Sequence, residues 1–240
     1  EPWLSDNDST QLAMVDQYDR EHSRDIEMDR DGYLDTYYLQ LAHNIRRFKG
    51  AGARQPVSAE KTITVRGGGK QWRDVTPVFR SPRGLTLHRD WDGFGNCHYV
   101  NTSGRNDILE ARVARDADTV FFRVTCAAPI TPREGEGWMT LFLNTDRRQD
   151  TGWEGYDLVI TRLPAPAGRA TVEAYRRTAE PGSFTWQSIG RAVLHVSGNS
   201  LTLALPRSFM PAGKLNFEFK WSDHMQQPTV MDFYENGSAA

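Results

Sequence analysis

The sequence of 240 residues has little cysteine, no long apolar run and no large excess of charge of one sign. Two cysteines, Cys97 and Cys126, are too few for a disulfide framework, and both a single disulfide in a secreted protein and two buried thiols stay open. Because no run of about 18 apolar residues occurs, we expect no membrane partner. The formal net charge of −2 leaves no electrostatic case for nucleic acid. The polar, acidic first ten residues lack the pattern of a signal peptide.

Signatures of several enzyme classes are absent as well. The sequence has no G-x-S-x-G elbow, no P-loop and no H-E-x-x-H motif. The glycines at 67–69 precede Lys70 but open no predicted helix, so they indicate a loop rather than a phosphate cradle. The six histidines are scattered, which argues against a zinc site. We therefore predict no complete active site in this chain.

Aromatic residues, in contrast, are plentiful: 7 Trp, 8 Tyr and 11 Phe. Hydrophobic residues make up 38% and charged residues 25%, which is ordinary for a globular protein with a real core. So many rings suit a large β core, and they also suit a sugar-binding surface.

The first 50 residues differ in pattern from the rest. Residues 11–17 form a short apolar run that predicts one buried strand, and residues 18–31 form a polar loop. Apolar side chains at helical spacing predict a helix over residues 34–48. Residues 51–60 are small and polar, so we predict a boundary there between two units, 1–50 and 61–240.

From residue 61 onward, short strand signals follow one another between turn residues. The predicted strands are 62–66, 72–79 (irregular, because of Pro77), 86–91, 97–101, 108–113, 119–126, 138–144, 156–162, 171–176, 184–189, 192–196, 201–205, 214–221 and 230–234. No long helical period interrupts them. We therefore predict a mainly β fold, an antiparallel β-sandwich with jelly-roll or immunoglobulin-like connections, preceded by the short N-terminal strand, loop and helix.

Two of these strands alternate apolar and polar side chains clearly enough to predict which residues face the core. The predicted inward residues are Val120, Phe122, Val124, Cys126, Leu215, Phe217, Phe219 and Trp221.

Several segments, in this order, resemble the family 9 carbohydrate-binding modules and the wider DOMON-like sandwich group. They are WRDVTPVF (72–79), YVNTSGRNDI (99–108), DTVFFRV (118–124), WMTLFLNTD (138–146), TGWEGYD (151–157) and FKWSD (219–223). The resemblance covers roughly 170 residues. It implies a glycan-binding β-sandwich, and sandwiches of this group often hold structural calcium.

The N-terminal segments 15–18, 23–27 and 37–50 resemble the last strand, loop and helix of a (β/α)8 glycoside-hydrolase-like barrel. In such enzymes this loop lies over the active site. The resemblance implies an upstream barrel and a chain that is a piece of a larger glycan-processing protein. The cluster of Glu21, His22, Asp25 and Glu27 would then supply one carboxylate of a glycosidase pair or a substrate contact, and the alternative is a charged surface loop.

The loop at 144–157 collects hard oxygen donors around two glycines, as calcium sites do. The predicted ligands are Asn144, Asp146, Asp150 and Asp157. The EF-hand spacing is absent, and the alternative is a solvated acidic hairpin loop.

Four tryptophans beside polar residues are candidate platforms for the C–H faces of a sugar. They are Trp91, Trp153, Trp138 and Trp186. For each of them the alternative is a ring that packs in the core.

We therefore predict a non-catalytic carbohydrate-binding or accessory domain, stabilised by Ca²⁺, with a glycan as partner and a secreted, cell-surface or periplasmic location. Two alternatives stay open: part of a glycoside hydrolase whose N-terminal loop contributes to the active site, and a purely structural brace.

Overall fold

The computed structural model describes most of the chain after residue 54. The described residues are 55–81, 83–84, 89–92, 98–101, 104–133, 137–148, 150–153, 155–179 and 183–223. The chain divides into two compact units, one of Glu1–Ala53 with Gly84–Gly104 and one of Arg54–Arg83 with Arg105–Ala240. The elements predicted within residues 1–50, the acidic residues there and the strand predicted at 230–234 lie outside the described residues.

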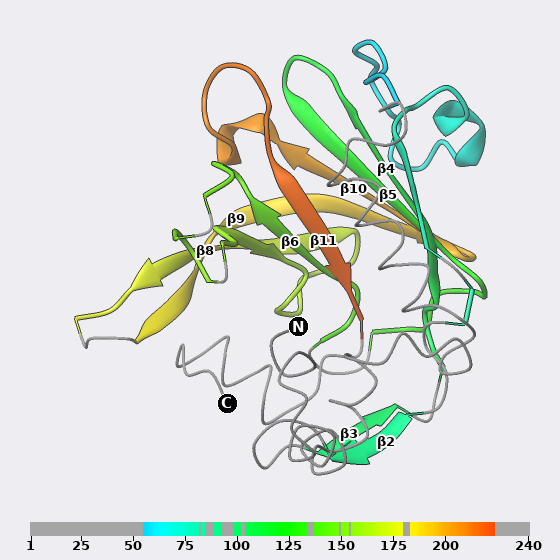
Figure 1. The fold of residues 1–240 in the computed structure, drawn as a ribbon. Helices are drawn as coiled ribbons and strands as arrows, with labels where there is room; N and C mark the ends of the chain where they lie inside the picture. Colours follow the sequence, from blue (N-terminus) through cyan, green and yellow to red (C-terminus); the bar gives the residue numbers. More distant parts are fainter. Residues whose placement is uncertain are drawn as a thin grey trace, which may run out of the picture. The chain divides into compact units, whose positions relative to one another are not determined.

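The second unit contains an antiparallel sheet of nine strands, so the fold is mainly β, as predicted (Figure 1). The strands are β1 (Val78–Arg80), β4 (Ile108–Arg115), β5 (Thr119–Cys126), β6 (Thr140–Asn144), β7 (Leu158–Ile160), β8 (Arg169–Arg177), β9 (Phe184–Ser197), β10 (Ser200–Pro206) and β11 (Glu218–Ser222). Their order in the sheet is β1-β4-β5-β10-β9-β8-β7-β6-β11. Two short 3₁₀ helices, η2 (Gly69–Trp72) and η3 (Arg207–Phe209), accompany them. Within the described residues, no helix is long and apolar enough to cross a membrane.

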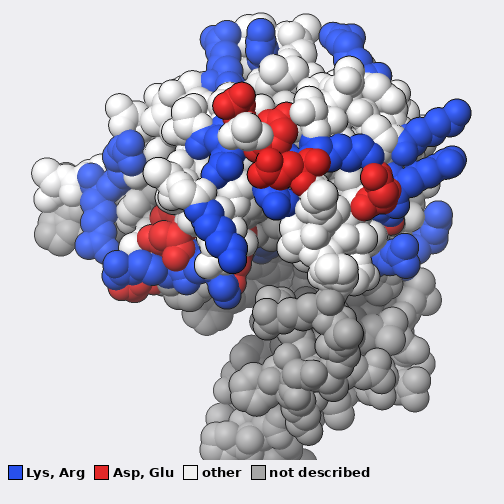
Figure 2. Space-filling model, turned by 90° about the horizontal axis from the view of Figure 1, so that it is seen from above, with Lys and Arg blue, Asp and Glu red and all other residues white. Residues whose placement is uncertain are grey.

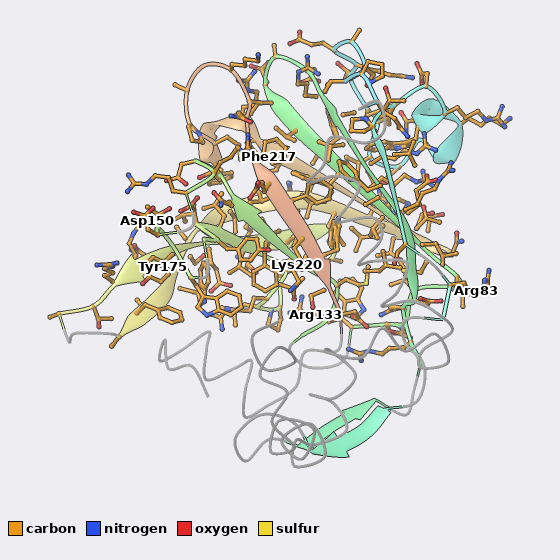
Figure 3. The ribbon with its side chains drawn as sticks, viewed as in Figure 1. Arg83, Arg133, Asp150, Tyr175, Phe217 and Lys220 are labelled. Carbon is orange, nitrogen blue, oxygen red and sulfur yellow. The ribbon has the colours of Figure 1, made fainter. Side chains whose placement is uncertain are left out.

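One face of this sheet, which we call the inner face, covers the main hydrophobic core. On β5, Val120, Phe122, Val124 and Cys126 are all 0% exposed and belong to this core, as their alternation predicted. The predicted inward residues of segment 214–221 are partly buried against the same core, among them Phe217 just before β11 (Figure 3). Removing these side chains from water is the main stabilising term of such a sheet.

The sheet is curled, because its first and last strands meet through aromatic side chains. The rings of Phe79 on β1 and Phe219 on β11 lie 5.0 Å apart in an edge-to-face arrangement. Phe219 also contacts Phe122 of β5, the third strand from the β1 edge, at 5.8 Å. The aromatic contacts thus join both edges of the sheet to its middle.

Residues 62–66 do not form the predicted strand. The side chain of Gln71 binds both backbone groups of Thr64: Thr64 N donates to Gln71 Oε1 at 3.0 Å, and Gln71 Nε2 donates to Thr64 O at 2.7 Å. The segment lies over the face of the sheet opposite the inner face, which we call the outer face. There Ile63 and Trp72 pack with Phe121. The backbone N–H and C=O of Thr64 therefore bond to the side chain of Gln71, and they are not available to the backbone of a neighbouring strand.

The strands predicted at 184–189 and 192–196 are one long strand, β9. The register between β8 and β9 shifts at Val172/Glu173, which accommodates Gly190 as part of a bulge. A Cβ atom at Gly190 would approach the ring of Phe209 to 2.6 Å. The glycine therefore lets the strand continue beneath Phe209, instead of ending it as the sequence pattern indicated.

The first unit contributes a separate hairpin of β2 (Arg89–Asp92) and β3 (His98–Asn101), which pair in antiparallel register. Trp91 stands opposite Tyr99. The two strands overlap the segments 86–91 and 97–101 that the sequence predicted as strands.

Cys126 is a free, fully buried thiol. Burial, with smaller contributions from the charges of Asp223 and Asp107, raises the pKa of this thiol from 9.0 to about 12. The native thiol therefore stays protonated at neutral pH, and for this residue the interpretation as a buried thiol holds.

We expect Cys126 to be unreactive toward a disulfide reagent at pH 8 in a folded Cys97→Ser variant, and to react at once in denaturant. Because the native state holds its proton more tightly than the unfolded state, the free energy of unfolding should fall by about 1.4 kcal/mol per pH unit above pH ~9. Thiol titration and urea unfolding from pH 8 to 10.5 measure the two effects. Rapid labelling of the native variant would contradict the burial.

Candidate functional site

The loop between β6 and β7 is held together by its own hydrogen bonds. Asn144 is 1% exposed. Its Oδ1 accepts from the backbone N–H of Arg147 at 2.6 Å, and its Nδ2 donates to the carbonyl of Arg148 at 3.1 Å. Such side-chain bonds to the backbone stabilise tight turns.

The three predicted aspartate ligands are likewise bound to donors within the loop. Asp146 accepts from the N–H of Arg148, Asp157 Oδ2 accepts from Thr145, and Asp150 forms a two-point ion pair with Arg148. The hydrogen bond from Arg148 is the largest cause that lowers the pKa of Asp150.

These carboxylates do not converge on a common point. Among the described residues, no group of three or more His, Cys, Asp or Glu is arranged to hold a metal ion. Calcium binding by this loop stays a prediction from the sequence.

The same loop places two rings on the outer face of the sheet, opposite the main core. Together with rings from β6, β8 and β9 they form what we call the outer aromatic cluster. Its members are Phe142, Trp153, Tyr156, Tyr175, Phe184 and Trp186, packed around Val159. Neighbouring ring centroids lie 5.1–6.2 Å apart. These distances are typical of favourable aromatic pairs.

Trp153 and Tyr156 owe their positions to a tight turn. Their backbones exchange two hydrogen bonds, of 2.9 and 2.7 Å. Gly152 before them has a φ of +68°, and a Cβ atom there would lie 2.1 Å from the carbonyl oxygen of Tyr156. Only glycine therefore fits this turn. Both rings consequently pack against Phe142 in a tilted arrangement, with centroid distances of 5.5 and 5.3 Å.

The cluster has a buried base and an accessible rim. Phe142, Phe184 and Trp186 are 1%, 3% and 6% exposed. Trp153, Tyr156 and Tyr175, in contrast, are half-buried and form what we call the aromatic rim; Tyr175 extends from β8 (Figure 3). Burial, and secondarily the charge of Glu218, raises the pKa of Tyr156, so its hydroxyl stays protonated and can donate a hydrogen bond at neutral pH.

The four predicted tryptophans have different environments. Trp153 is in the aromatic rim, and Trp186 is in the buried base next to it. Trp138 is 5% exposed in the main core, and its Nε1 donates to the carbonyl of Thr131 at 2.9 Å. Trp138 and Trp186 therefore pack against other apolar side chains in this structure, and a sugar contact through either ring stays a prediction from the sequence. The side chain of Trp91 lies outside the described residues.

Tyr156 and Tyr175 are members of the site that the sequence analysis missed. Tyr175 pairs in register with Trp186, so the alternation of β8 against β9 was the signal that could have identified it. Tyr156 had no comparable signal, because only the turn at Gly152 brings it over Phe142.

Comparisons with models of protein families, with curated proteins and with solved structures gave no match.

A buried ion pair borders the cluster. Arg162 contacts Glu173 through two bonds: Nε to Oε2 at 3.1 Å and Nη2 to Oε1 at 2.7 Å. Glu173 is 0% exposed and stands opposite Val159 in the β7–β8 register. The guanidinium of Arg162 therefore compensates the buried charge of Glu173 next to the outer aromatic cluster.

Proposed function

We propose that this chain is a non-catalytic glycan-binding domain of a larger glycan-processing protein, and that the aromatic rim binds the sugar. The observation that carries the proposal is the arrangement of Trp153, Tyr156 and Tyr175 as half-buried rings on a buried aromatic base. Rings held in this way lose little conformational freedom when a ligand stacks on them. The alternatives, a contribution of residues 18–31 to a hydrolase active site and a structural brace, have no comparable support in the described residues.

The chemistry of the rim supports a sugar as ligand. Flat rings attract the C–H faces of a pyranose, while neighbouring polar groups bind its hydroxyls. The protonated Tyr156 hydroxyl is one such group. The exposed Lys220 on β11 pairs in register with Phe142 and is a second donor beside the rim (Figure 3).

Two finer features belong to the same proposal. The contact between Phe79 and Phe219 supports closure of the curled sheet into a sandwich-like form. Calcium would act as a structural ion and not as part of the sugar site. Thermal unfolding of the chain in calcium and in EDTA tests this role, and the same Tm in both would overturn it.

Replacing Trp153 with alanine should weaken glycan binding at least about tenfold, or about 1.4 kcal/mol, because it removes the most extended ring of the rim. Trp153→Phe should retain part of the affinity. The measurement is calorimetric titration of the full chain with soluble plant and bacterial polysaccharides.

Val57→Ala is the control, because Val57 is 69% exposed and lies outside the aromatic rim and outside the contacts that join the strands. It should leave glycan affinity unchanged, and circular dichroism should show that all three variants fold. If the wild-type chain binds no polysaccharide in the survey, or if Trp153→Ala binds as tightly as wild type, the proposal fails.

A further inference from the structure

The near-neutral charge of the whole chain hides an uneven distribution. The unit of Arg54–Arg83 and Arg105–Ala240 has 22 Lys and Arg against 18 Asp and Glu, whereas the remaining residues have 7 against 13. The sheet unit is therefore basic. Figure 2 shows Lys and Arg side chains spread over one face of this unit, with smaller groups of Asp and Glu among them. A basic surface raises the local concentration of anions.

Part of this charge gathers on the outer face of the central strands. We call this group the basic patch and define it as Arg66, Arg123, Arg169, Arg191 and His195. The register places them together: Thr202 on β10 stands between Arg123 on β5 and His195 on β9. Val193 on β9, two residues from both Arg191 and His195, stands opposite Arg169 on β8. Residues two apart on a strand share a face.

Arg66 approaches this face from the segment that lies over it. A Cβ atom added to Gly168, the residue before Arg169, would lie 3.9 Å from Arg66 Nη2. Arg66, Arg169 and Arg191 are all exposed, and Val193 among them is 37% exposed. The cations of the patch therefore face solvent around an accessible apolar side chain.

None of the five patch residues forms an ion pair within the described part of the chain, although the charge of Glu110 acts on Arg123 without a direct contact. The ion pairs found there involve other cations: Lys61, Arg80, Arg105, Arg112, Arg147, Arg148 and Arg162. Arg123 donates to Ser200 Oγ at 2.8 Å, and burial is the main cause that lowers the pKa of its guanidinium. Clustered guanidinium groups without ion-pair partners repel one another, and an anionic ligand would relieve that repulsion.

The basic patch and the aromatic rim lie on the same face of the same two strands. Tyr175 and Arg169 are six residues apart on β8, which corresponds to about 20 Å along a strand. On β9, Trp186 beneath the rim and Arg191 of the patch are separated only by the bulge region. An extended polymer that stacks on the rim would therefore meet the arginines next.

We propose that the glycan bound at the aromatic rim is a polyuronate, whose carboxylates bind Arg169, Arg191 and Arg66 of the basic patch. This inference rests on the proposed function and names the ligand class of the same site. Guanidinium groups bind carboxylates through two parallel hydrogen bonds, which suits a carboxylate on every sugar. A polynucleotide is the other polyanion with stackable rings, and binding of an oligonucleotide is one of the outcomes that the test distinguishes.

The test uses the full chain and two forms of one polymer: sodium polygalacturonate and the same polymer with its carboxyl groups reduced to alcohols. Calorimetric titration at low salt should give tighter binding to polygalacturonate by about tenfold or more. The preference should shrink as sodium chloride is raised, because exposed charges are screened.

The variant Arg169→Gln/Arg191→Gln should bind polygalacturonate about tenfold more weakly, with affinity for the reduced polymer unchanged. The control Arg176→Gln removes the same charge from an exposed position of β8 whose guanidinium contacts Gln187 instead of the patch. It should behave as wild type. Both variants should melt at the wild-type temperature, since all three arginines are exposed.

The outcomes separate the two proposals. Equal affinity for both polymers, or no effect of the double variant, overturns the polyuronate inference and leaves glycan binding intact. No binding to either polymer or to the neutral polysaccharides overturns the proposed function itself. Binding of a single-stranded oligonucleotide at the patch as tightly as polygalacturonate overturns the assignment to a glycan.

Discussion

Replacing Arg162 with methionine is expected to lower the free energy of unfolding by about 3–5 kcal/mol, the largest effect we foresee for a single polar side chain. The substitution keeps most of the side-chain volume but leaves the Glu173 carboxylate without its two guanidinium bonds. Glu173 is 0% exposed, so water cannot replace those bonds. An uncompensated charge in the interior costs far more than the pair contributes.

A double variant separates the cost of the lone charge from the value of the pair. Arg162→Met/Glu173→Leu removes both charges and should recover much of the lost stability, because apolar side chains of similar volume suit the neighbouring aromatic cluster. Urea unfolding followed by tryptophan fluorescence measures all variants.

Arg148→Met is the matched control for this pair. It breaks the exposed ion pair with Asp150 by the same chemical change and should have no measurable effect on stability. If Arg162→Met proved as mild as this control, Glu173 would have to be reached by water or another donor, and the buried pair would lose its structural role.

Replacing Asp223 with alanine should destabilise the fold by about 3 kcal/mol. Its carboxylate, 4% exposed, accepts three hydrogen bonds. Oδ2 accepts from Arg105 Nε and Asn106 Nδ2, both at 3.0 Å, and Oδ1 accepts from the N–H of Met139 at 2.8 Å. Asp223 thereby ties the end of β11 to the segments before β4 and β6, and its loss leaves buried donors without an acceptor.

Met139 and Asn106 both have positive φ angles, of 42° and 53°. Such conformations are disfavoured for residues other than glycine and persist where surrounding contacts impose them. Asp223→Asn should therefore cost less than Asp223→Ala, because one carbonyl oxygen can still accept from Met139. Asp150→Ala, at an exposed aspartate, should leave stability unchanged. Equal stability of Asp223→Ala and Asp150→Ala would show that these segments are held by other contacts.

Most strands could be predicted from patterns of residues that are close together in the sequence. The hairpin of β4 and β5 was predictable because Asp116 caps its own turn: its Oδ1 accepts from the N–H groups of Asp118 and Thr119 at 3.0 and 2.9 Å. The inward set on β5 followed from simple alternation. Residues close together in the sequence determine both the turn and the inward-facing side chains, so the sequence is sufficient to predict them.

The candidate tryptophans show that the sequence pattern does not predict which rings are buried. Trp138 and Trp153 both stand beside glycines and acidic residues, yet Trp138 is in the main core and Trp153 is in the accessible rim. The carboxylates of the 144–157 loop looked like metal ligands because their donors from the same loop could not be foreseen. Burial and pairing depend on which segments cover a residue, and spacing in the sequence does not encode that.

The sequence alone therefore determined that this protein is mainly β, where most strands lie and which of their faces is apolar, because these properties depend on residues within a few positions of one another. Only the tertiary structure decided that the strands form one curled sheet of nine, that Tyr156 and Tyr175 join Trp153 in a rim, and that four arginines gather with His195 on the same outer face. Those features join residues from distant segments, and only strand order, register and packing bring them together.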